Sequence, residues 1–438
     1  MPRFAPLALA LAASLPLPAF AVSEADLQTL RAELAQLKSA YETRLKDLES
    51  RLARAEERPA PASNAATPAR TLNPEIALVL SGVYTNLTQN PANYRITGFA
   101  PGGEIGPGNR GFNLSESELG LAANIDERFR GSLTFALAPD NTVSTEEAYL
   151  QTTAMPHGLS LKAGRFLSGI GYLNEHHAHT WDFVDAPLAY QAFLGGQFGD
   201  DGVQLKWLAP TEQFLELGLE MGRGRNFPGT NQDKNGLGSG ALSLHTGSDL
   251  GRDQSWRGGV SWLASSPRGR TWEENNLAGA AVNNRFTGQS RLWLADFIWK
   301  WQPEGRRTSL KVQGEYLHRR ESGSLTYDTA GAASSDVYRT VQSGGYLQGV
   351  YQFLPAWRIG LRQDWLDTGT ISLGSNAANL AAPAFRPAKT SLMLDWNPSE
   401  FSRIRLQYAQ DQSRQGLTDN QLFLQYQMSL GAHPAHAY

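Results

Sequence analysis

A short segment of the chain concentrates histidines and carboxylates at a spacing that could hold a metal ion. In an extended backbone, His177 and His179 point their imidazole rings to the same side. Imidazole together with carboxylate is a donor set that suits zinc and similar ions. The sequence therefore predicts a metal contact, with zinc as the bound or transported ion and no resident cofactor required. Alternatively, the histidines are ordinary polar lining of a constriction. The predicted metal set is Glu175, His176, His177, His179 and Asp182.

A second group of charged residues alternates with apolar ones on segments that the pattern predicts to be strands. If these strands line a wet lumen, a basic stripe could face an acidic patch, and such charges tune selectivity. The alternative is a solvated, mutually paired wall with no specific role. Both signs are present, so the sequence predicts no strong preference for anions or cations. The candidate lumen residues are Glu216, Glu220, Arg358, Arg362, Arg403 and Arg405.

Signatures of enzymes and of nucleic-acid binding are missing from the sequence. There is no His-Glu-x-x-His, no Gly-x-Ser-x-Gly and no phosphate-binding loop, and the 438 residues include no cysteine. The formal net charge of -3 does not favour nucleic acid. We therefore expect a protein that is not an enzyme, although one sequence leaves open a hydrolase with Ser, His and an acid on one wall.

Residues 1–21 have the three parts of a secretory signal. Arg3 supplies a positive charge, an apolar run rich in Ala and Leu follows, and Ala19-Phe20-Ala21 is a small-residue cleavage pattern. The apolar run is too short to cross a bilayer. We therefore expect cleavage after Ala21 and export of the remaining chain.

Residues 22–58 have the heptad pattern of a coiled coil. Leu27, Leu30 and Leu34 step by three and four, and charged residues occupy most other positions. The pattern predicts a periplasmic coiled coil and, through it, a homo-oligomer such as a trimer; the alternative is a single amphipathic helix lying on another surface. Residues 59–73 are rich in Pro and Ala, which predicts a semi-extended linker.

From residue 74 onward the apolar period changes to two, which is typical of strands with one apolar face. The last stretch, Leu422 to Tyr438, alternates in this way and ends on an aromatic residue. Together with the export signal, this pattern predicts a closing strand that the barrel assembly machinery would recognise, with lipid outside and a wet lumen inside.

Loop lengths decide the number of strands. Short turns should lie on one side of an outer-membrane barrel and long loops on the other. About sixteen strands satisfy this rule, provided that the Gly- and Ser-rich stretch 239–248 is one of them. The expected long loops are 88–111, 170–200, 225–238, 267–289, 320–342 and 368–387. The sequence therefore predicts an all-β membrane protein, an antiparallel transmembrane β-barrel of about 16 strands over residues 74–438. A soluble β-sandwich is the alternative.

Several segments resemble a known family. These are 73–82, Gly164-Arg165-Phe166 continuing to His176, 181–187, and 400–408. Together they resemble proteobacterial outer-membrane proteins catalogued as zinc-regulated TonB-dependent outer-membrane receptors. The resemblance implies an outer-membrane barrel made when zinc is scarce. A coiled coil followed by a barrel is also similar to coiled-coil-bearing porins, in architecture only.

These observations predict a porin-like channel in the outer membrane of a Gram-negative bacterium, for uptake of small hydrophilic solutes, with zinc or a zinc complex among them. The alternative is a structural protein, whose coiled coil would contact the cell wall or a periplasmic partner. The expected partners are outer-membrane lipid, further copies of the chain and the assembly machinery, without nucleic acid.

Overall fold

The computed structural model describes residues 74–431, except 101, 104 and 231–234. The predicted signal, coiled coil and linker lie outside the described residues, as does the end of the chain from residue 432. The coiled-coil trimer and the recognition of the last residues by the assembly machinery therefore stay predictions. Among the described helices, none has the length and hydropathy needed to cross a bilayer.

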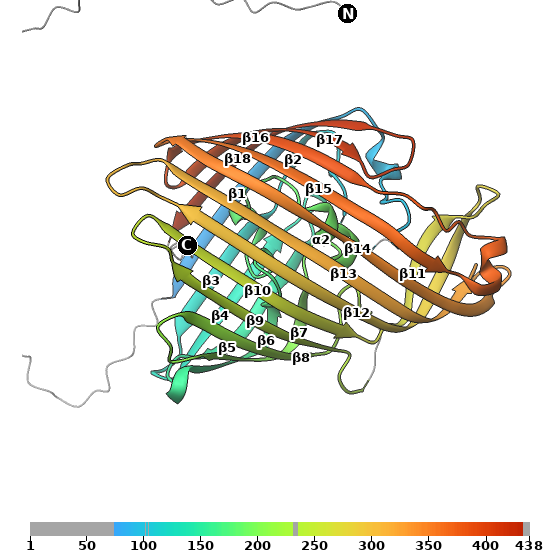
Figure 1. The fold of residues 1–438 in the computed structure, drawn as a ribbon, viewed down its shortest axis with the longest axis horizontal. Coiled ribbons are helices and arrows are strands. Elements are labelled where there is room, and N and C mark those ends of the chain that lie inside the picture. The colour runs from blue at the N-terminus through green and yellow to red at the C-terminus, as the bar shows by residue number, and fades with distance from the viewer. Residues whose placement is uncertain (1–73, 101, 104, 231–234, 432–438) are drawn as a thin grey trace, which may run out of the picture. The chain divides into compact units, whose positions relative to one another are not determined.

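The described chain forms one closed antiparallel sheet, shown in Figure 1. Its segments are β1 (Glu75–Leu87), β2 (Gly111–Leu114), β3 (Ser117–Asn124), β4 (Phe129–Leu137), β5 (Val143–Thr152), β6 (Leu159–Leu167), β7 (Gly199–Leu208), β8 (Phe214–Gly222), β9 (Ser239–Asp249), β10 (Gln254–Ser265), β11 (Arg268–Asn275), β12 (Ala281–Trp301), β13 (Ser309–Tyr327), β14 (Ser334–Leu354), β15 (Trp357–Ser372), β16 (Ala388–Ser399), β17 (Ser402–Gln412) and β18 (Asp419–Gly431). Short helical elements are η1 (Pro91–Asn93), η2 (Pro156–Gly158), η3 (Ala178–Thr180), α2 (Leu188–Leu194) and η4 (Gly374–Ala378).

The eighteen segments make a barrel of sixteen strands. β2 and β3 are successive parts of one strand because both pair with β1, and β10 and β11 are parts of another because both pair with β12. β18 pairs with β1 and closes the sheet. The predicted strand number is confirmed, and β9 forms at the Gly- and Ser-rich stretch on which that number depended. The closed sheet excludes the sandwich.

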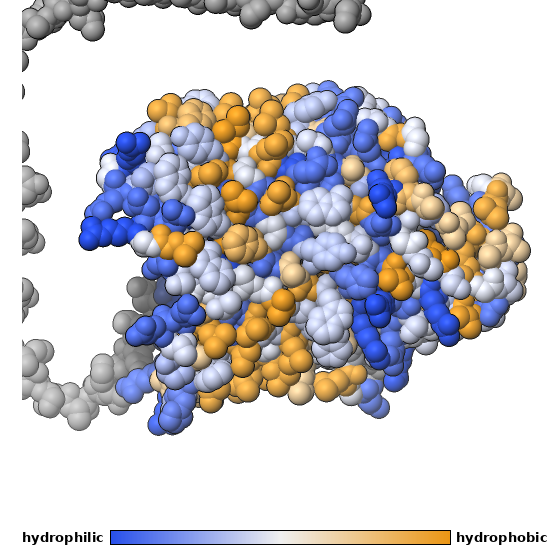
Figure 2. Space-filling view, viewed as in Figure 1, coloured by the Kyte–Doolittle hydropathy of each residue, from blue (hydrophilic) through white to orange (hydrophobic). Residues whose placement is uncertain are grey.

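The two faces of the barrel differ in polarity, as the alternation predicts. On β18, Leu422, Leu424 and Tyr426 are 40 to 47% exposed, whereas Phe423 between them is 1% exposed. Apolar and aromatic side chains cover the middle of the outer face in Figure 2, and strongly hydrophilic residues gather at the end that carries the short turns. An outward apolar band with aromatic residues near its edges is what a lipid environment requires.

The prediction of long loops at 267–289 and 320–342 is wrong, because both segments consist largely of strands. β11 and β12 continue as a ladder up to Asn275 and Ala281, and β13 and β14 continue to Tyr327 and Ser334. These extensions have a small core of their own on the inward face, because Phe286, Leu325 and Tyr338 pack there. Burial of these apolar side chains stabilises the strands well beyond the length that a membrane crossing needs.

Candidate functional site

The segment between β6 and β7, residues 168–198, folds into the barrel rather than away from it, and is called the inward loop below. Ser168, Ile170 and Asn174 are at most 1% exposed, and every residue of α2 is buried. Pro187 precedes α2, and Gly195 ends it with a φ of 69°, a left-handed conformation that glycine adopts without strain. The long loop 170–200 is thus a folded insert inside the barrel.

Apolar contacts hold α2 against one side of the wall. Buried residues of α2, among them Tyr190 and Phe193, belong to the same cluster as Leu292, Leu294 and Leu317 of β12 and β13. Inward positions of a large barrel are normally polar. Leu292, Leu294 and Leu317 are apolar because α2 covers them.

Buried ion pairs fix the part of the inward loop that precedes α2. Asp182 lies against Lys311 and Arg358. Asp185 lies 3.1 Å from Arg362 and 2.7 Å from Lys389. Burial disfavours both carboxylates in their charged form, but the adjacent cations outweigh it and hold the pKa of Asp182 and Asp185 well below the usual range.

The four arginines predicted to face the lumen all contact this insert. Arg358 and Arg362 form ion pairs with Asp182 and Asp185. Arg403 donates to the carbonyl oxygen of His179 at 2.8 Å, and Arg405 donates to that of Trp181 at 3.0 Å. We call the four arginines and Lys389 the basic clamp. Their side chains face inward, and their partners are the inward loop and polar residues of the wall, among them Asp364 and Asp395.

The two glutamates of the predicted acidic patch also have partners, and those of Glu220 belong to the inward loop. Glu220 accepts hydrogen bonds from the hydroxyl of Ser168 at 2.6 Å and from the backbone N–H of Gly169 at 2.8 Å. Glu216 lies 3.2 Å from Lys206. A role of these two glutamates and of the four arginines in selectivity stays a prediction.

On another part of the wall, carboxylates of β3 and β5 surround two histidines of the inward loop. His179 Nδ1 lies 2.7 Å from Glu118 Oε1. His177 Nδ1 lies 3.0 Å from Glu146 and 3.1 Å from Glu118, and its Nε2 lies 3.0 Å from Glu147. These five residues are called the acidic gate.

The charge of His177 follows from its surroundings. Both ring nitrogens face carboxylate oxygens, so both must carry a proton to donate to them. Burial opposes the charged ring, but the hydrogen bonds to the three glutamates outweigh it and raise the pKa of His177 well above its ordinary value. At neutral pH a proton shared among carboxylates therefore holds this side of the loop to the wall.

Of the five residues predicted to bind metal, the structure brings together His177 and His179. His176 Nδ1 instead contacts the carbonyl oxygen of Tyr172 at 2.7 Å, and Glu175 pairs with Lys206 and Arg257 at 3.1 and 3.2 Å. Asp182 is held by Lys311 and by Arg358 of the basic clamp. Among the described residues, one of two groups that could hold an ion is Glu118, His177 and His179, whose donor atoms lie within 4.8 Å of one another; the other is Glu116, Glu118 and Glu146. Two imidazoles and one carboxylate are a familiar zinc set.

Sequence reasoning missed Glu146 and Glu147, because neighbouring residues of a regular strand point to opposite faces. In the structure the β4–β5 ladder shifts register between Thr134 and Phe135, which leaves Glu146 as the extra residue. A bulge of this kind re-aims a side chain. Both glutamates consequently reach the same imidazole, and only the Glu146-Glu147 dipeptide itself could have drawn attention to them.

Two cavities meet at the acidic gate. One of about 590 Å³ lies on the long-loop side and includes Glu146 and Arg165 in its lining. The other, of about 600 Å³, lies on the short-turn side and includes Glu147 and His177. Leu167 lines both. The gate therefore stands between two water-accessible spaces, whereas the basic clamp holds the loop against β15 to β17.

The closed sixteen-stranded sheet, its apolar outer band and the insert in its lumen define the class: a porin-like β-barrel of the outer membrane. Two solved structures share this fold, the outer membrane protein OmpT of Vibrio cholerae folded in vitro and its loop L8 deletion mutant. Each is 10% identical, covers 82% of this chain and 97% or 99% of its own, and has a TM-score of 0.50.

No family model matches the sequence. An uncharacterized protein of Aquifex aeolicus (strain VF5) is 32% identical over 394 residues, which are 83% of this chain and 80% of that protein. The chain belongs to the same family as this protein. The resemblance to zinc-regulated TonB-dependent receptors stays a prediction.

Proposed function

We propose that the protein is an outer-membrane channel through which small hydrophilic solutes pass between the inward loop and the wall of β1 to β6. The observation that carries this proposal is the pair of cavities that meet at the acidic gate. A sixteen-stranded barrel is wide enough for an aqueous channel. The two cavities follow the wall of β1 to β6, and the gate supplies the charged groups at the point where they meet.

Three glutamates around two histidines favour cations at that point. Carboxylate rings in a pore attract cations and repel anions, because few water molecules screen the charge at such short range. We propose that zinc, or an ion of similar coordination, replaces the proton that His177 shares with its glutamates. Glu118 and the two imidazoles would be its ligands.

Such a site has the properties that transport requires. Three protein ligands leave at least one coordination position open for water, so the ion can exchange. A conducting site must bind well enough to collect the ion and weakly enough to release it. Glu146 and Glu147 are within reach of His177 and would accept the ion as it leaves, so that the gate binds in steps.

Single-channel recording in planar bilayers tests the proposal. The wild type should give current steps, and micromolar zinc on the long-loop side should reduce or interrupt them. In the H177A/H179A variant this effect should be lost. The matched control is His176→Ala, which removes a neighbouring imidazole that contacts the carbonyl oxygen and the ring of Tyr172, and which should keep the zinc effect.

The channel and the metal site can be disproved separately. Steps without any zinc effect in the wild type would remove the metal site and leave the channel. A folded barrel without steps under any condition would remove the channel, and the structural or tethering function predicted from residues 22–58 would then be the better reading. The absence of enzymatic activity stays a prediction.

A further inference from the structure

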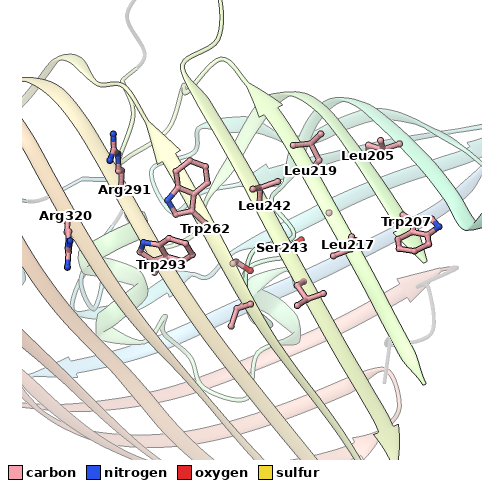
Figure 3. Close-up of a pocket in the computed structure, with 14 residues that line it drawn as sticks. Leu205, Trp207, Leu217, Leu219, Leu242, Ser243, Trp262, Arg291, Trp293 and Arg320 are labelled. Atoms are coloured by element: carbon pink, nitrogen blue, oxygen red, sulfur yellow. The ribbon is translucent and has the colours of Figure 1, made fainter. Parts of the chain in front are cut away.

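A hollow of about 850 Å³ lies on the outer face of the barrel, across β7 to β10 and β12. Its lining is almost entirely apolar and includes Leu219, Leu242 and Val260 from three successive strands. Figure 3 shows Arg291 and Arg320 beside one edge of it, next to Trp262 and Trp293. The hollow faces the surrounding membrane, away from the gate.

The hollow forms because the side chains in its middle are smaller than those around it. Val260 pairs with Leu244 on one side and with Ala295 on the other. Larger rings flank this row: Trp262 and Trp293 stand above it with ring centres 6.2 Å apart, and a second aromatic pair lies below. The result is an apolar groove between two aromatic ridges.

The two arginines at the edge are unusual for a membrane surface. Arg291 and Arg320 are directly opposite each other in the β12–β13 ladder, and both are exposed. Like charges in such a pair repel. Arg291 donates to the amide oxygen of Gln289 at 2.9 Å and Arg320 to the ring of His318 at 3.3 Å, which are neutral acceptors. Among the described residues neither arginine forms an ion pair within 4.0 Å.

Their height on the barrel is that of the lipid headgroups. Arg291 stands ten residues before Trp301, and Arg320 ten residues after Leu310, which pairs with Trp301. About ten residues are the length of one tilted membrane crossing. An arginine on the lipid face costs little at the interface and several kcal/mol at the midplane. Both arginines therefore lie at the level of phosphate groups in the leaflet on the long-loop side.

We propose that this groove is a binding site for one phosphorylated lipid of that leaflet, with an acyl chain along Leu219, Leu242 and Val260 and a phosphate between Arg291 and Arg320. Charge complementarity favours this occupant, because a single lipid brings an anion and an apolar chain at the spacing that the arginines and the groove present. A second copy of this chain would have to bring both from its own outer surface.

Native mass spectrometry of the protein in detergent micelles tests the site, with a diphosphorylated multi-acyl glycolipid as the probe. The wild type should retain the glycolipid. R291Q/R320Q should bind it about thirtyfold more weakly, since each basic residue near a membrane surface contributes about 1 kcal/mol. Val260→Trp, which fills the groove and keeps both arginines, should also weaken binding.

A charge-matched control is R252Q/R386Q, which removes two highly exposed arginines elsewhere and should bind the glycolipid like the wild type. The dephosphorylated glycolipid should bind the wild type weakly, and inorganic phosphate should not displace the lipid. Equal retention by the wild type and R291Q/R320Q would overturn the proposal. So would displacement by phosphate alone, or a change from oligomer to monomer in R291Q/R320Q without lipid, which would assign the groove to a second copy. Channel conductance should be unchanged in all these variants.

Discussion

Two parts of the barrel wall, β14 to β17 and β3 to β5, hold the same inward loop with opposite charges. On the β14–β17 side, the arginines and the lysine of the basic clamp take carboxylates and carbonyl oxygens of the loop. On the β3–β5 side, glutamates of the acidic gate take two histidines of the loop. Arginine and lysine keep their charge at every physiological pH, whereas a histidine holds a proton that a metal ion can replace. The difference supports the proposal that the gate exchanges its proton for an ion while the clamp holds the loop.

Removing an aspartate that the clamp holds should have the largest effect on stability. Asp185→Ala leaves Arg362 and Lys389, both buried, without their shared partner. Breaking a buried pair in this way typically costs about 3 to 5 kcal/mol. The free energy of unfolding, measured by denaturant titration in detergent micelles, should fall by about that amount.

The control for this variant is Arg386→Ala, at an ion pair whose arginine is 84% exposed and 3.5 Å from Asp367. Exposed pairs contribute at most about 1 kcal/mol. Similar losses in the two variants would show that the clamp is no stronger than a surface pair. Because the loop is less firmly held, Asp185→Ala should also give noisier channel currents than the wild type.

Neutralising the gate should change selectivity with a smaller effect on stability. Glu147→Gln keeps the shape and one hydrogen-bond acceptor for His177 but removes a charge at the meeting point of the cavities. One charge at about 4 Å in watery surroundings contributes about 1 kcal/mol, or roughly fivefold in ion preference. The reversal potential in a salt gradient should shift accordingly towards less cation preference. Glu304→Gln, 78% exposed in a short turn, should leave the potential unchanged, and an equal shift there would point to surface charge instead.

Acid should weaken the loop only slightly and only at low pH. Burial raises the cost of charging Glu175, but Lys206 and Arg257 outweigh it and lower its pKa to about 2. Because the folded pKa is depressed, the contribution of Glu175 to the stability of the loop is complete above the unfolded value near 4.3 and is lost as the pH falls towards 2. Current fluctuations should therefore be constant from pH 7 to 5 and grow below pH 4. Glu175→Gln should fluctuate more already at pH 7; growth of the wild-type fluctuations at pH 6 would contradict this assignment.

The barrel could be predicted from the sequence because its signal is repeated in every strand. Each strand alternates in polarity, and the rule for short and long connections decides even the Gly-rich β9. The extensions of β12 to β14 were mistaken for loops since their exposed face is polar. Their inward apolar side chains, Phe286, Leu325 and Tyr338, lie at strand spacing on separate segments and could have revealed the ladder.

The site was predictable only in part, because its contacts join residues far apart in the chain. The pattern His177-x-His179 places two imidazoles together, and alternation places Glu118 inside. No sequence rule could show that a bulge turns Glu146 and Glu147 to one face, or that Asp182 and Asp185 would occupy the arginines. Charges that seemed available to solutes are satisfied by the insert.

The unequal strand lengths give the mouth of the barrel a slant. β12 and β14 have 21 residues each, whereas β4 and β6 across the barrel have 9, and the longer strands project at one end in Figure 1. The cavity on the long-loop side opens beside the short wall. A bulky particle descending along the membrane normal would strike the tall rim first, while a hydrated ion arriving from the low side would find the way in unobstructed. In the proposed channel, the slanted rim would therefore exclude large particles before solutes reach the acidic gate.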